Sequence, residues 1–134
     1  MAGGDARSRA VAGTAITKLC SLEVGLTGVR EQEARAAGID AVSVTIESTT
    51  RAGYMPDAPR VTVRMAAERG TGRLLGAQIV GGPGAAKRID TVATALAARM
   101  TVDDVAELDL AYAPPFSSVW DPVAVAARAA TRAI

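Results

Sequence analysis

The chain has 134 residues, nearly half of them apolar, and a formal net charge of +1. This length predicts one domain, and the scattered Lys and Arg residues form none of the basic patches that nucleic-acid binding needs. No apolar run is long enough for a membrane span, and the N-terminus lacks the apolar segment of a signal peptide. We therefore expect a cytoplasmic protein with no nucleic-acid partner and no membrane partner.

Two residue types that are scarce or missing exclude most catalytic machinery. The chain contains no His and one Cys. Without His there is no imidazole base, no imidazole metal ligand and no Ser-His or Cys-His nucleophile pair. A single Cys allows neither an internal disulfide nor a Cys-x-x-Cys redox pair. We expect the isolated chain to be inactive, with no catalytic residue and no metal site of its own.

The first half of the chain predicts strands and one short helix. Residues 1–11 are small and polar without periodicity, which predicts a linker or disordered N-terminus. Residues 15–28 predict an extended segment, and residues 31–37 a short helix that ends at Gly38. Residues 41–47 alternate apolar and polar side chains, which indicates a half-buried strand.

The second half predicts a hairpin followed by helices. Residues 60–80 form two alternating segments around a Gly-containing turn, which indicates a β-hairpin. Residues 85–99 carry apolar side chains on one helical face. Thr101 and Asp104 form a capping box, and Asp121 caps a last helix. This order predicts an α+β fold: an antiparallel sheet of about three to five strands with helices packed on one side.

A proline-rich segment at residues 108–122 stands out from the rest of the chain. It holds half of the prolines, the only Trp, the only Phe and one of the two Tyr. The Pro114-Pro115 pair fixes two φ angles and removes two backbone donors, so the segment can be neither a helix nor an inner strand. We expect a rigid, extended connection that presents aromatic groups, which is typical of an interface or a ligand site.

Two features resemble functional sites but favour a structural interpretation. Residues 81–88 follow a strand and precede a helix, as phosphate-binding loops do. They lack the third Gly of a dinucleotide fingerprint and the Ser or Thr that follows Lys in a P-loop, so we predict a structural turn. Cys20 lies in an apolar segment, where a lone Cys is usually a small core residue.

Charged residues near the helix starts allow alternatives. Lys87, Arg88 and Asp90 either form a solvated helix face or make an intersubunit ion pair or anion contact. Asp103 and Asp104 lie in the first turn of a predicted helix, where carboxylates complement the helix dipole. We therefore interpret that acidic pair as structural.

The two tyrosines occupy similar surroundings. Tyr54 and Tyr112 each lie in a Pro-containing loop, at residues 53–56 and 111–114. Such a tyrosine either caps the edge of the core or offers its hydroxyl to a ligand or a partner subunit. The residues alone leave both interpretations open.

The segment at residues 108–123 resembles the C-terminal dimerisation domain of flavin-dependent pyridine nucleotide-disulfide oxidoreductases, in particular the coenzyme A disulfide reductase and NADH oxidase branch. The resemblance extends over roughly residues 12–132, so we predict a dimerisation domain over residues 12–134. Its further motifs are Gly13–Lys18, Thr27–Val29 with Glu33–Ala34, Gly53–Pro56, Gly76–Gly81 and Lys87–Asp90.

The resemblance implies a part of a larger enzyme. In the family a flavin domain, which carries the nucleophilic cysteine, and a nicotinamide domain precede this one, so FAD and NAD(P)H are implied for the parent enzyme and none is expected to bind this chain alone. The implied partners are a second copy and those missing domains. Tyr54 and Tyr112 match the two positions that approach the partner subunit's ligand and redox cysteine. The implied wall of the interface and active site is made of Pro114, Pro115, Phe116 and Trp120.

Alternatives to this interpretation belong to other functional classes. The absence of His excludes the glutathione reductase branch, which uses a His-Glu pair. A free-standing module that binds coenzyme A or another small thiol near the tyrosines is the main alternative. A self-sufficient enzyme is disfavoured by the missing His and second Cys. A chain that begins near the family's domain boundary is expected to be an excised domain or a truncated product.

Overall fold

The computed structural model describes residues 11–134. The predicted N-terminal linker at residues 1–11 lies outside the described residues except for Val11. The strands are β1 (Ala15–Leu19), β2 (Leu22–Gly28), β3 (Ala41–Thr49), β4 (Arg60–Glu68) and β5 (Leu74–Gly81). The helices are α1 (Glu31–Ala36), the 3-10 turn η1 (Ala86–Arg88), α2 (Ile89–Ala97), α3 (Val102–Ala106) and α4 (Pro122–Thr131).

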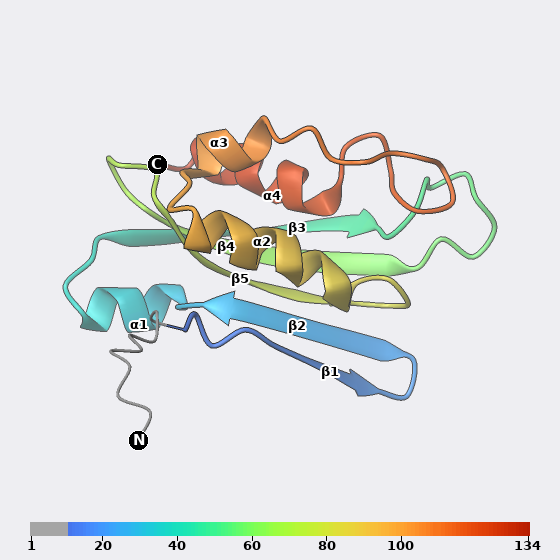
Figure 1. Cartoon of the computed structure of the whole chain (residues 1–134), viewed down its shortest axis with the longest axis horizontal. Helices are drawn as coiled ribbons and strands as arrows, with labels where there is room; N and C mark the ends of the chain where they lie inside the picture. Colours follow the sequence, from blue (N-terminus) through green and yellow to red (C-terminus); the bar gives the residue numbers. More distant parts are fainter. Residues whose placement is uncertain (1–10) are drawn as a thin grey trace, which may run out of the picture.

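The strands form one five-stranded sheet in the order β1-β2-β5-β4-β3, and every neighbouring pair is antiparallel. The predicted hairpin over residues 60–80 is confirmed as β4 and β5, which lie inside the sheet (Figure 1). The α+β class and the number of strands are therefore as predicted.

The segment at residues 15–28 is a hairpin and not a single extended stretch. Strands β1 and β2 pair across a turn at Cys20-Ser21, where the φ angle of Cys20 is +54°. The thiol is exposed, so the expectation of a buried core cysteine is wrong. The sequence hides this turn because left-handed positions favour Gly or Asn, and neither residue occurs there.

The main core lies between the sheet and the helices α2, α3 and α4. Alternate residues of β4 point to this side, and Val63 and Met65 are completely buried. Ile79 of β5 joins them, as the two-residue period of a strand requires. The helices contribute Ile89, Val92, Ala95, Val102, Val105, Val123, Ala126, Ala127 and Ala130.

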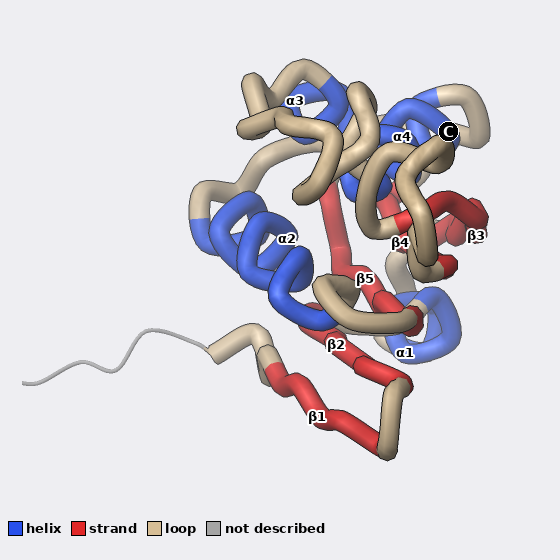
Figure 2. Tube along the Cα trace, turned by 90° about the vertical axis from the view of Figure 1, so that its right-hand side faces the viewer, coloured by secondary structure: helices blue, strands red, loops and turns tan. Residues whose placement is uncertain are grey.

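Helix α1 covers the opposite face of the sheet (Figure 2). Its Ala34 packs in a second, smaller cluster with Ala41, Ala66 and Leu75. The expectation that the helices lie on one side therefore holds for α2, α3 and α4 and not for α1. The predicted end of α1 is confirmed, since Gly38 has a φ of +80° just beyond the helix.

The predicted helix starts are confirmed for α3 and α4. The Thr101 hydroxyl accepts a hydrogen bond from the Asp104 backbone N–H over 3.1 Å. The Asp104 carboxylate in turn accepts one from the Thr101 backbone N–H over 2.8 Å. Asp121 accepts from the Val123 N–H at 2.8 Å. The helix predicted over residues 85–99 instead begins with η1 and ends at Ala97. Within residues 11–134, no helix has the length and apolar character to cross a membrane.

Candidate functional site

The two tyrosine-bearing loops lie side by side at one end of the molecule (Figure 1). Tyr54 lies in the connection between β3 and β4, and Tyr112 in the connection between α3 and α4. The Ala52 N–H donates to the Pro114 carbonyl over 3.0 Å, which joins the loops directly. Residues that are far apart in the sequence therefore form one surface.

Both phenol groups are presented to solvent. The exposed fraction is 76% for Tyr54 and 48% for Tyr112. Partial desolvation raises the pKa of Tyr112 above its ordinary value, and the adjacent Tyr54 raises it further. A phenol whose pKa is ordinary or raised is protonated at neutral pH, so the Tyr112 hydroxyl can donate a hydrogen bond.

The proline pair forms a turn in place of the expected extended connection. The N–H groups of Phe116 and Ser117 both donate to the Ala113 carbonyl, over 2.9 and 3.0 Å. The segment is neither helix nor strand, as predicted. The turn buries Ser117 and leaves the ring of Phe116 78% exposed.

An exposed apolar surface continues from this turn toward α4. Val119 and Trp120 are more than half exposed, and the Arg128 guanidinium lies 3.6 Å from the centre of the Trp120 ring. A cation over an indole fixes the ring without burying it. The hollow beside Tyr112 is lined by residues 108–112 and 117–121 together with Ala124. Trp120 and Tyr112 thus border the same hollow.

Arg88 lies at the same end of the molecule, in surroundings that the sequence does not predict. Its side chain is only 11% exposed and pairs with Asp121 at 2.9 Å. It therefore does not belong to a solvated helix face. The guanidinium also donates to the carbonyls of Thr50, Gly84 and Phe116. The sequence does not mark this role, because three of the four partners lie 28 to 38 residues away in the chain and only Gly84 is local.

The neighbouring charges behave more simply. Lys87 and Asp90 form an ion pair one helical turn apart, and both side chains are more than half exposed. Such a pair contributes little to stability. Asp104 belongs to the capping box, and Asp103 accepts from the Thr131 hydroxyl over 2.8 Å. The structural interpretation of the acidic pair is consistent with both contacts.

The glycine-rich turn at residues 81–86 already contains a carboxylate. Glu23 of β2 accepts from the N–H groups of Gly84 and Ala86, over 3.0 and 3.1 Å. These are the donors that a phosphate would use at such a turn. The turn does not fit the phosphate groups of FAD or NAD(P)H, in agreement with the predicted structural role.

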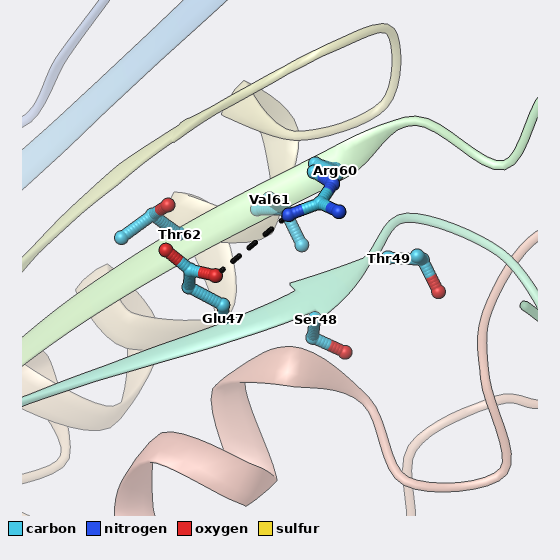
Figure 3. A pocket seen from close by; sticks show the side chains of 6 residues that line it. All are labelled: Glu47, Ser48, Thr49, Arg60, Val61 and Thr62. Carbon is cyan, nitrogen blue, oxygen red and sulfur yellow. Dashed lines mark ion pairs between the residues drawn. The ribbon is translucent and has the colours of Figure 1, made fainter.

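A second hollow lies on β3 and β4 (Figure 3). Glu47 and Arg60 point toward each other across the two strands, with 3.9 Å between their charged atoms. Both side chains are more than three-quarters exposed, so water screens the pair. This hollow holds none of the predicted site residues.

Comparison with known proteins identifies the family. Residues 14–124 match the pyridine nucleotide-disulphide oxidoreductase dimerisation domain. The chain is 42% identical over 128 residues to the NAD(P)H coenzyme A polysulfide/persulfide reductase of Pyrococcus horikoshii, covering 96% of this chain and 28% of that protein. It is 34% identical over 111 residues to the coenzyme A disulfide reductase of Staphylococcus haemolyticus, covering 83% of this chain and 25% of that protein.

A solved structure supports the same assignment. The NAD-dependent persulfide reductase from A. fulgidus superimposes with a TM-score of 0.91 at 44% identity, over 98% of this chain and 24% of that one. The chain therefore corresponds to about a quarter of such proteins. On the sequence match and the fold together, this chain belongs to the dimerisation-domain family of the pyridine nucleotide-disulphide oxidoreductases.

Proposed function

We propose that this chain is the homodimerisation domain of an FAD- and NAD(P)H-dependent disulfide oxidoreductase, and that Tyr54 and Tyr112 complete the active site of the partner subunit. The observation that carries the proposal is the meeting of two exposed tyrosines from separate loops. Two adjacent, exposed phenols bury little apolar area and so add little to the stability of this domain, and a role in binding accounts for them better.

The phenols would act as hydrogen-bond donors. A protonated hydroxyl donates to a thiolate or to a polar atom of a thiol ligand, and such charge-assisted bonds are the stronger ones. The pKa of Tyr112 is raised and not lowered, so its phenol is protonated at neutral pH, as an ordinary phenol is. In this role the tyrosines hold a ligand or stabilise a negatively charged sulfur, and their protons stay on the phenol oxygens.

The exposed apolar residues supply a surface for the second copy. Phe116, Val119 and Trp120 are all more than half exposed. Together with the turn at Pro114 and Pro115 they form a rigid wall beside the tyrosines. FAD and NAD(P)H would bind to the domains that the relatives carry in addition, where they would supply the redox chemistry.

Solution mass tests the homodimer. We expect light scattering over a wide concentration range to show a dimer that persists to low micromolar concentration. Replacing Phe116 and Trp120 together by Ser should shift the chain to monomer, whereas Val11→Ser, at another exposed apolar residue, should not. A monomer at every concentration would contradict the proposal that this domain dimerises through its own surface.

Complementation between subunits tests the tyrosines. This chain would replace the matching segment of the Pyrococcus horikoshii reductase. One version of the chimera carries Tyr54→Phe and Tyr112→Phe, and the other lacks the nucleophilic cysteine of the flavin domain. If the tyrosines act across the interface, the mixed dimer contains one intact site and regains activity. If each version is inactive and the mixture stays inactive although mixed dimers form, the trans role is wrong.

The alternative function is a free-standing module that binds coenzyme A or another small thiol. The hollow beside Tyr112 favours it. Calorimetry with coenzyme A distinguishes the two: micromolar binding by a monomeric chain would support the module, and no binding at millimolar concentration would exclude it.

A further inference from the structure

A single side chain connects the two tyrosine-bearing loops. Arg88 donates through Nη2 to the Thr50 carbonyl over 2.7 Å and to the Phe116 carbonyl over 2.9 Å. Thr50 opens the loop that carries Tyr54, and Phe116 follows Tyr112 in the other loop. Because both carbonyls accept from one nitrogen atom, the position of that nitrogen helps to set the separation of the loops, together with the direct bond between Ala52 and Pro114.

The position of that nitrogen is fixed from the other side of the guanidinium. Nε donates to Asp121 over 2.9 Å, and Nη1 donates to the Gly84 carbonyl. Asp121 is itself held, because its other oxygen caps α4 at Val123. The planar group therefore cannot turn without losing its bonds to Asp121 and to the Gly84 carbonyl.

Only an arginine satisfies this arrangement. A guanidinium carries five donors in one rigid plane, whereas a lysine carries three on a single rotatable nitrogen. Arg88 and Asp121 are both nearly buried, with 11% and 14% of their side chains exposed. Few waters can therefore replace a lost donor.

We infer that Arg88 is a positioning residue that sets the separation of the Tyr54 and Tyr112 hydroxyls. The inference rests on the proposed function, in which both phenols reach the same ligand. Donors held at a fixed separation bind a ligand without having to be ordered again at each encounter.

The effect of Tyr54 on the pKa of Tyr112 depends on the distance between the two phenols, so it reports their separation. The chain has only two tyrosines, so isotope-labelled tyrosine rings give two NMR signals, and Tyr54→Phe leaves that of Tyr112 alone. We expect Tyr54→Phe to lower the pKa of Tyr112, since Tyr54 raises it. In the Arg88→Lys variant, we expect the pKa of Tyr112 to be lower than in the unaltered chain. Adding Tyr54→Phe to that variant should lower the pKa no further.

Matched variants separate positioning from stability. Arg64→Lys alters an arginine that also makes several bonds, on the face covered by α1, and should leave the influence of Tyr54 intact. Should Arg88→Lys fail to fold by circular dichroism, Asp121→Asn keeps a capping oxygen while removing the ionic partner, and it should also abolish the influence.

The inference is overturned if Tyr54→Phe shifts the pKa of Tyr112 by the same amount in the unaltered chain and in the Arg88→Lys variant. It is also overturned if Tyr54→Phe leaves the pKa of Tyr112 in the unaltered chain unchanged. The titration uses this chain alone, whereas the proposed function is tested by activity in mixed dimers. A negative titration result therefore leaves the trans role standing, and a negative complementation result leaves the positioning measurement valid.

Discussion

The helix-covered core and the loop end of this molecule are stabilised by different interactions. In the core, residues such as Met65 and Ile79 are completely buried among apolar neighbours. At the loop end, few side chains are buried, and the hydrogen bonds converge on one guanidinium. Apolar packing spreads its free energy over many contacts, whereas the loop end depends on a few hydrogen bonds, most of them made by one residue. The part of the molecule that presents the tyrosines is thus the part most sensitive to a single polar substitution.

Removing Arg88 should have the largest effect. Arg88→Met leaves the nearly buried carboxylate of Asp121 without its partner. Breaking a buried pair by removing one member costs about 3–5 kcal/mol in the free energy of unfolding. Urea denaturation measures this loss. Arg64→Met removes a half-exposed arginine and should cost less than about 1 kcal/mol. Equal losses would show that the loop end does not depend on Arg88.

A cavity in the core should be the next largest change. Met65 is completely buried, so Met65→Ala should lower the free energy of unfolding by about 3 kcal/mol. Met55 is only half-buried in the tyrosine loop, and Met55→Ala should cost less than about 1 kcal/mol. The two variants compare the same substitution in the two regions. A larger loss at Met55 would reverse the comparison.

Overpacking between sheet and helix should have an intermediate effect. A Cβ on Gly25 would lie 2.9 Å from the Ala86 carbonyl oxygen and 3.1 Å from the Ile89 Cβ. Gly25→Ala should therefore cost about 1–3 kcal/mol, measured by thermal unfolding. At Gly53, in the tyrosine loop, the nearest atom would be 3.9 Å away. Gly53→Ala should be nearly neutral, and a comparable loss there would mean that the loop is packed as tightly as the core.

The smallest expected effect concerns the exposed cap of α3. The backbone N–H and hydroxyl of Thr101 hold the pKa of Asp104 below its ordinary value. A lowered pKa stabilises the folded state above the ordinary value, and this contribution is lost as the pH falls through the lowered one. Asp104→Ala should thus reduce the melting temperature at neutral pH and converge with the unaltered chain at about pH 2. A pH-independent difference would contradict this.

Local patterns in the sequence predict what local forces determine. The alternation in residues 41–47, the capping box at Thr101 and the cap at Asp121 each depend on neighbours in the chain, and all three are confirmed. Cys20 was misassigned because its turn uses a left-handed residue that is not Gly. The surroundings of Arg88 are not predicted because three of its four partners, Thr50, Phe116 and Asp121, lie 28 residues or more away in the chain, which no local pattern contains.

The candidate site likewise contains residues that the sequence points to and one that it does not. Resemblance to the family singled out Tyr54 and Tyr112, and the structure places them on adjacent loops. Their role toward a partner subunit stays a prediction. The arginine that donates to both loops could not be found from the sequence, since a buried arginine and a solvated one look alike in a charged helix start.

Glu23 has a consequence for anions in the surroundings of the protein. Its carboxylate is tethered next to the N–H groups of Gly84 and Ala86, so it acts as an internal competitor at high effective concentration. A dissolved phosphate would have to displace a group that cannot diffuse away. The turn is thereby self-inhibited as an anion receptor.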